Sequence, residues 1–77
     1  MHWSDMLSAI ERASWKYRDT NRPVYRAAAI AAIHIARGEE GVESRSSCLD
    51  RYGVDGRSAT RAYERGYQDG RRLARQV

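Results

Sequence analysis

The chain has 77 residues and a net charge of +4, with a single cysteine and a single proline. This length corresponds to one domain, residues 1–77, and a lone cysteine excludes an internal disulfide and a cysteine-rich metal site. No apolar run is long enough to span a membrane, and the opening residues MHWSDML lack the pattern of a signal peptide. We therefore expect a soluble cytoplasmic protein without a metal or cofactor.

The composition favours an all-α fold. Eleven alanines stand against four valines and four isoleucines, and no segment alternates apolar and polar residues as a half-buried strand does. We predict a small bundle of three main helices plus a short connecting helix.

The first predicted helix begins near Ser4, a favourable N-cap residue. Its inward face consists of residues three or four positions apart: Trp3, Met6, Leu7, Ile10, Ala13, Ser14 and Tyr17. Trp15 points to the opposite side, beside Arg12, and is an alternative candidate for contact with a partner protein, because an exposed tryptophan next to an arginine is typical of interface hot spots. The polar segment 18–23 ends the helix.

The second predicted helix begins at Thr20 or Asn21, with Pro23 tolerated in its first turn, and ends before Gly38. Its sequence VYRAAAIAAIHIAR is apolar almost all the way round, which is typical of a helix covered by neighbours on two sides. We therefore place it at the centre of the bundle. His34 lies near its polar strip and is expected to be solvated or hydrogen-bonded rather than a ligand.

A polar, acidic connector separates the second helix from the rest of the chain. A short third helix is predicted over residues 46–52, with Cys48, Leu49 and Tyr52 facing inward. Gly53 is expected to end it, and Asp55 to cap the last helix.

The last predicted helix has two opposed faces. The inward face is made of small residues and tyrosines, together with one leucine: Ala59, Ala62, Tyr63, Gly66, Tyr67, Gly70, Leu73 and Ala74. A glycine inside a helix costs about 1 kcal/mol relative to alanine, so the two glycines four positions apart need a compensating gain. We expect that gain to be close approach to the alanine-rich second helix.

The opposite face carries a row of arginines, which we call the arginine ridge: Arg57, Arg61, Arg65, Arg72 and Arg75. Like charges one turn apart repel, and the neighbour pairs Arg61–Glu64, Arg65–Asp69 and Asp69–Arg72 are expected to relieve this only in part. The ridge is either a solvated face, its arginines reflecting GC-rich coding, or a surface that binds anions. Phosphate backbones and acidic protein grooves are the anions that a row of arginines suits.

The segment AYERGYQDG, residues 62–70, resembles the opening motif of the ribosome modulation factor family. The resemblance rests on Arg65, Gly66, Tyr67, Gln68 and Gly70. It implies a small basic protein that binds ribosomal RNA.

Residues 47–63 also resemble a helix-turn-helix. The matching inward and turn positions are Leu49, Gly53, Val54 and Ala59. In that motif the helix carrying Arg57, Thr60 and Arg61 would be the recognition helix in a major groove of DNA.

Nothing in the sequence indicates catalysis, because it has no glycine-rich phosphate loop, no nucleophile–histidine–carboxylate set and no metal-ligand spacing. We predict a non-catalytic protein that engages nucleic acid or a nucleoprotein through the arginine ridge. The alternative is a phage or mobile-element protein that inhibits a host complex, such as a CRISPR complex or a regulator. It would dock on an acidic host protein surface through Trp15, Arg12 and the ridge. Either protein could form a homodimer.

Overall fold

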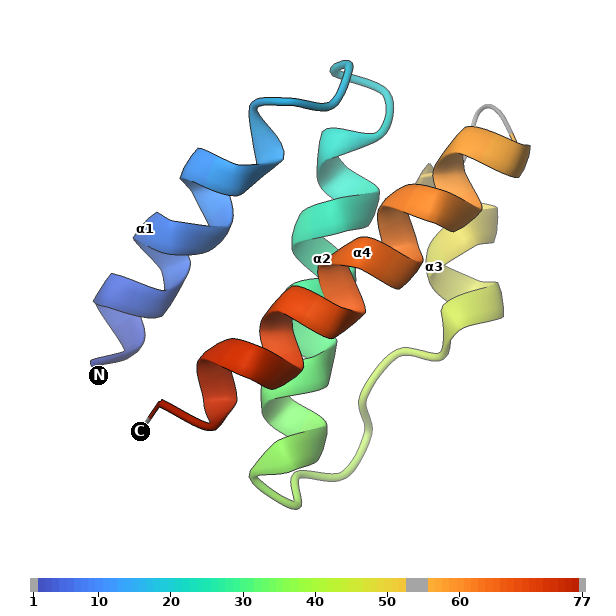
Figure 1. The fold of residues 1–77 in the computed structure, drawn as a ribbon. Coiled ribbons are helices and arrows are strands. Elements are labelled where there is room, and N and C mark those ends of the chain that lie inside the picture. Colours follow the sequence, from blue (N-terminus) through green and yellow to red (C-terminus); the bar gives the residue numbers. More distant parts are fainter. Residues whose placement is uncertain (1, 53–55, 77) are drawn as a thin grey trace.

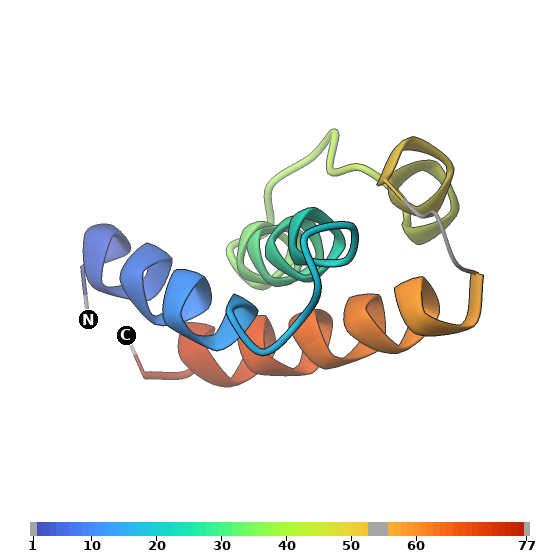
Figure 2. The ribbon, with the colours of Figure 1, turned by 90° about the horizontal axis from the view of Figure 1, so that it is seen from above.

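In a computed structural model, which describes residues 2–52 and 56–76, the described chain folds into four helices. They are α1 (Trp3–Ser14), α2 (Arg22–Ala36), α3 (Arg45–Tyr52) and α4 (Gly56–Ala74). α2 packs against each of the other three, most extensively against α4. α1 and α3 lie on opposite sides of α2, and α4 crosses it in a second layer (Figure 1, Figure 2). The predicted all-α bundle around a central second helix is confirmed.

The ends of α2 follow from local backbone chemistry. Asn21 is the N-cap residue and a proline lies in the first turn, as predicted. Gly38 adopts a positive φ of 75°, which favours glycine. Its N–H bonds to the carbonyl of Ile35 at 2.9 Å, and the N–H of Glu39 bonds to the carbonyl of His34 at 3.1 Å. This pair of bonds is the Schellman pattern, and it confirms the predicted end of the helix.

α1 differs from its prediction at two points. Its N-cap residue is His2, whose extended backbone precedes a helix that already includes Ser4, so the predicted cap at Ser4 is wrong. Leu7, expected to face inward, is exposed. The buried stripe of α1 is narrower than the apolar pattern suggests and consists of Met6, Ile10 and Ser14.

The short helix α3 covers one edge of the core. Cys48 is buried, while Leu49 and Tyr52 are half-buried and pack against the core, as predicted. Burial raises the pKa of the Cys48 thiol. The predictions for Gly53, Val54 and Asp55 lie outside the described residues.

None of the helices in the described ranges is long and apolar enough to cross a bilayer.

Candidate nucleic-acid interface

Gly66 and Gly70 of α4 rest directly on the backbone of α2. A Cβ added at Gly66 would lie less than 3.0 Å from the carbonyl oxygen of Tyr25. A Cβ added at Gly70 would meet three backbone atoms of Ala29, all closer than 3.0 Å. The two helices therefore approach as closely as their backbones allow, which confirms the expected reason for the two glycines. This contact fixes how α4 presents its outer face.

A buried carboxylate ties the same two helices together. The side chain of Asp69 is only 5% exposed, and its Oδ2 accepts a 2.5 Å hydrogen bond from the hydroxyl of Tyr25, which is fully buried. Arg65 Nε lies 3.4 Å from Asp69 Oδ1, and an Nη atom of Arg72 lies 3.3 Å from the same oxygen. Two guanidinium groups on the rim thus compensate one buried negative charge, as a buried carboxylate requires.

The burial of Asp69 was not predicted from the sequence. The pairs Arg65–Asp69 and Asp69–Arg72 form as predicted. The prediction, however, treated them as surface pairs that only relieve repulsion between arginines. In the structure the aspartate belongs to the packed interface and the arginines cover it. The signal that could have found it is Tyr25, because a tyrosine on a helix buried all round needs an acceptor for its hydroxyl.

All five side chains of the arginine ridge are exposed, four of them on α4 and that of Arg75 just beyond its end. Seen from above, no other helix covers the outer side of α4 (Figure 2). Within the described ranges, Arg61 and Arg75 have no ion-pair partner, whereas Arg57 takes part in an interaction of its own.

The expected pair between Arg61 and Glu64 does not form. Glu64 pairs with Arg45 of α3 instead, at 3.4 Å. α3 packs against α4 and offers the guanidinium of Arg45 to Glu64. Arg61 is therefore left without a described counter-ion, and the ridge is more strongly cationic than the sequence alone suggests.

Trp15 is 63% exposed just beyond the end of α1, and the side chain stacked on its ring is that of Arg22. The guanidinium carbon of Arg22 lies 4.0 Å from the centre of the Trp15 ring. Arg12 is exposed on the last turn of α1 and, among the described residues, does not stack on Trp15. Stacking by Arg22 holds the tryptophan against the start of α2 while leaving much of its surface open.

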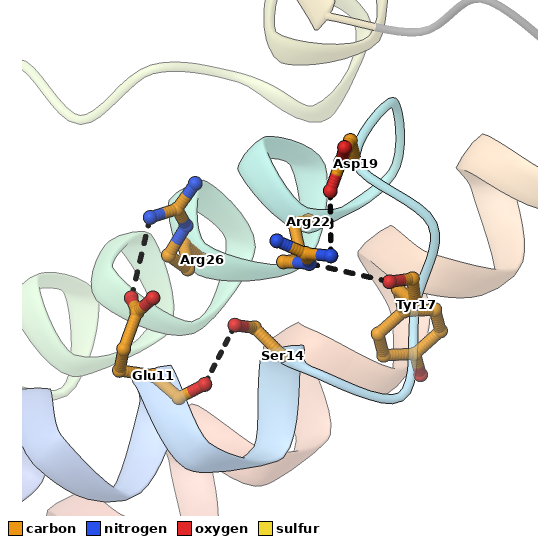
Figure 3. A network of polar contacts seen from close by, with 6 residues as sticks. All are labelled: Glu11, Ser14, Tyr17, Asp19, Arg22 and Arg26. Atoms are coloured by element: carbon orange, nitrogen blue, oxygen red, sulfur yellow. Dashed lines mark hydrogen bonds and ion pairs between the residues drawn. The ribbon is translucent and has the colours of Figure 1, made fainter.

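Arg22 also anchors the connector between α1 and α2 (Figure 3). Its Nε donates to the carbonyl oxygen of Tyr17 at 3.3 Å, and its Nη2 pairs with Asp19 at 2.5 Å. One helical turn further on, Arg26 pairs with Glu11 of α1 at 3.2 Å. The path of the connector is therefore defined by charged side chains of α2.

Three tyrosines have a pKa raised above the ordinary value of 10.0, in each case mainly through burial: Tyr17, Tyr25 and Tyr63. The rise is largest for Tyr25, where the hydrogen bond to Asp69 adds to the effect of burial.

The raised tyrosine pKa values predict a loss of stability in alkali. Below pH 10 these phenols are protonated in both the folded and the unfolded chain, so the stability they contribute is fully present. Above pH 10 the unfolded chain releases their protons while the folded chain retains them, and the free energy of unfolding falls as pH rises towards the folded pKa values. For one group the slope approaches about 1.4 kcal/mol per pH unit. Urea unfolding at pH 8, 10 and 11 measures it, and Tyr25→Phe should give a shallower fall. An equal fall in both proteins would contradict the assignment to Tyr25.

The histidine of α2 is engaged in a local contact. His34 Nδ1 is hydrogen-bonded to the carboxylate of Glu39, and its ring lies 5.5 Å from that of Trp3 at a tilt of 45°. The expectation of a hydrogen-bonded histidine is confirmed. In the described part of the chain no three histidine, cysteine or acidic side chains come together in a way that could hold a metal ion.

Comparisons of the chain with protein-family models, with curated proteins and with solved structures gave no match. The resemblances to the ribosome modulation factor family and to the helix-turn-helix motif remain predictions.

Proposed function

We propose that this protein is a non-catalytic binding protein that engages nucleic acid, free or within a nucleoprotein, through the arginine ridge. The observation that carries the proposal is the state of the ridge in the folded chain. Its side chains are exposed on the outer face of α4 and just beyond its end, and two of them, Arg61 and Arg75, have no ion-pair partner within the described residues. A ligand with regularly spaced negative charges would relieve the repulsion within the row.

The two arginines at Asp69 support the same function in another way. Each guanidinium has five N–H donors, and the contacts with Asp69 use one nitrogen of Arg65 and one of Arg72. Both side chains are more than half exposed although a buried carboxylate holds them, so further donors are accessible to a ligand. Such prepositioned guanidinium groups lose less conformational entropy when they bind phosphate.

Reversing the two unpaired charges should weaken nucleic-acid binding. For Arg61→Glu combined with Arg75→Glu we expect at least a tenfold loss of affinity for a labelled 20-nucleotide probe, because two phosphate contacts become repulsive. The slope of log K against log salt should fall in magnitude by about 2, roughly one for each lost contact. Fluorescence anisotropy from 25 to 200 mM salt measures both quantities. Arg65 and Arg72 are unsuitable for this test, since their reversal would also disturb Asp69.

The matched control is a double reversal away from the ridge, Arg37→Glu with Arg51→Glu. Both arginines are exposed, Arg37 lies over the ring of Trp3 and Arg51 pairs with Glu43, and the net charge changes by the same amount. We expect a smaller loss than for the ridge variant at equal salt. Equal losses would show that only the overall charge matters, and the ridge would then have no specific role.

The exposed Trp15 favours a second candidate function, docking on an acidic surface of a host protein through Trp15, Arg12 and the ridge. A large aromatic side chain held by a stacked arginine is suited to an interface hot spot. Absence of nucleic-acid binding at 25 mM salt would favour this candidate. Capture of a host protein that depends on Trp15, compared with Trp15→Ala, would then support an inhibitor of a host complex.

A further inference from the structure

A polar cleft of about 600 Å³ lies beside the ridge, between the first half of α4 and the connector that joins α1 to α2. Its basic side chains come from segments far apart in the sequence: Lys16 and Arg18 from the connector, and Arg61 from α4. No acidic side chain lines this cleft among the described residues. Walls that carry one sign of charge concentrate the electrostatic potential inside a cleft, so this one attracts anions.

A second cleft, of about 420 Å³, continues the first along α4. It shares Lys16, Tyr17 and Arg61 with the first and adds Arg65. The one acidic residue in its described wall is Glu64, whose carboxylate is paired with Arg45 of α3. The two clefts therefore form one basic groove that opens onto the ridge through Arg61 and Arg65.

The connector side of the groove is held in position. Arg22 bonds the carbonyl of Tyr17 and pairs with Asp19, so the residues between them, including Arg18, follow a defined path (Figure 3). Asn21, the last residue of the connector, also lines the groove.

We infer that this groove binds phosphate groups, and that a nucleic-acid strand lying on the ridge continues into it, so that Lys16 and Arg18 belong to the binding surface. The inference rests on the proposed function for the source of the phosphate. It adds to the binding surface a second wall, which the connector between α1 and α2 forms. It also gives the bound strand a direction, from α4 towards the connector. Phosphate groups in the groove would lie between cations on both sides, whereas the ridge alone contacts a strand from one side.

The test is Lys16→Glu combined with Arg18→Glu, after circular dichroism has shown that the variant folds. Both side chains are exposed, and neither forms an ion pair within the described residues. The probes are labelled 20-nucleotide single-stranded DNA, single-stranded RNA and duplex DNA, with inorganic phosphate titrated separately and followed by amide shifts in ¹H–¹⁵N spectra. We expect at least a tenfold weaker affinity for the preferred probe, and a salt slope about 2 smaller.

The control variant Arg37→Glu with Arg51→Glu, whose two side chains line neither cleft, separates position from net charge. If the groove variant binds like this control while the ridge variant is weakened, the groove inference fails and the proposed function stands. If the wild type binds no nucleic acid but phosphate shifts the amides of the groove, such as those of Tyr17 and Asn21, the groove holds a free phosphate compound and the proposed function fails. If neither probe nor phosphate binds, both are overturned.

Discussion

Gly70→Ala is expected to lower the stability of the fold by about 2 kcal/mol, although alanine is the better helix former by about 1 kcal/mol. The added methyl group would overlap three backbone atoms of Ala29. A backbone cannot rotate aside as a long side chain can, so α4 must move away from α2 along the largest contact in the molecule. The melting temperature should fall by roughly 8–16 °C for a chain of this size, measured by circular dichroism.

Gly56→Ala is the matched control for this substitution. Gly56 lies in the same helix, and a Cβ added there would meet nothing within 4 Å. We expect an unchanged or slightly higher melting temperature, because only helix propensity changes. Gly66→Ala should behave like the variant at Gly70, since its Cβ would overlap the carbonyl oxygen of Tyr25. If Gly70→Ala were as stable as Gly56→Ala, α4 and α2 would not be in the close backbone contact described above.

Asp69→Ala should be the most destabilising change of a charged residue in the described chain, with a loss of about 2–4 kcal/mol. It leaves the hydroxyl of Tyr25 buried without an acceptor and removes the partner of two arginines. A single core in a domain below about 80 residues rarely supplies more than about 3–5 kcal/mol, so much of the variant should be unfolded at 37 °C. Urea unfolding followed by circular dichroism measures the loss.

Asp69→Asn and Asp19→Ala give this prediction its controls. The asparagine retains an acceptor for the hydroxyl of Tyr25 and should therefore cost less than the alanine. Asp19 pairs with Arg22 at the same i, i+3 spacing as Asp69 with Arg72, but its side chain is 86% exposed, and its removal should cost less than about 1 kcal/mol. Equal losses of stability for Asp19→Ala and Asp69→Ala would show that the burial of Asp69 contributes nothing to the stability of the fold.

A double-mutant cycle between Asp69→Asn and Tyr25→Phe isolates the hydrogen bond itself. Residues in direct contact show coupling of about 0.5–3 kcal/mol, and the 2.5 Å separation of the two oxygens places this pair in that class.

The order and packing of the helices could be predicted from the sequence because they depend on local signals. Gly38 marks the end of α2 through a backbone conformation that favours glycine, and Pro23 marks its beginning. The position of α2 at the centre follows from an apolar surface on all sides. The two glycines of α4 predicted close helix contact because their cost in a helix requires a compensating gain.

The features that escaped prediction depend on contacts between distant residues. The hydroxyl of Tyr25 and the carboxylate of Asp69 are 44 positions apart, and nothing local to the aspartate indicates its burial. On a helical wheel it borders the arginines, where an acidic side chain is expected to be solvated. The exchange of partners at Glu64, which pairs with Arg45 rather than with its own helix, likewise depends on where α3 packs.

The length of α4 sets a length scale for a ligand that lies along it. From Arg57 to Arg72 the helix rises about 22 Å at 1.5 Å per residue. Each strand of a duplex carries one phosphate per about 3.4 Å of its helix axis, so a ridge parallel to that axis matches a footprint of about six to seven base-pair steps. Oligonucleotides shorter than this footprint should therefore lose affinity with each nucleotide removed, whereas longer ones should gain only by offering more overlapping positions.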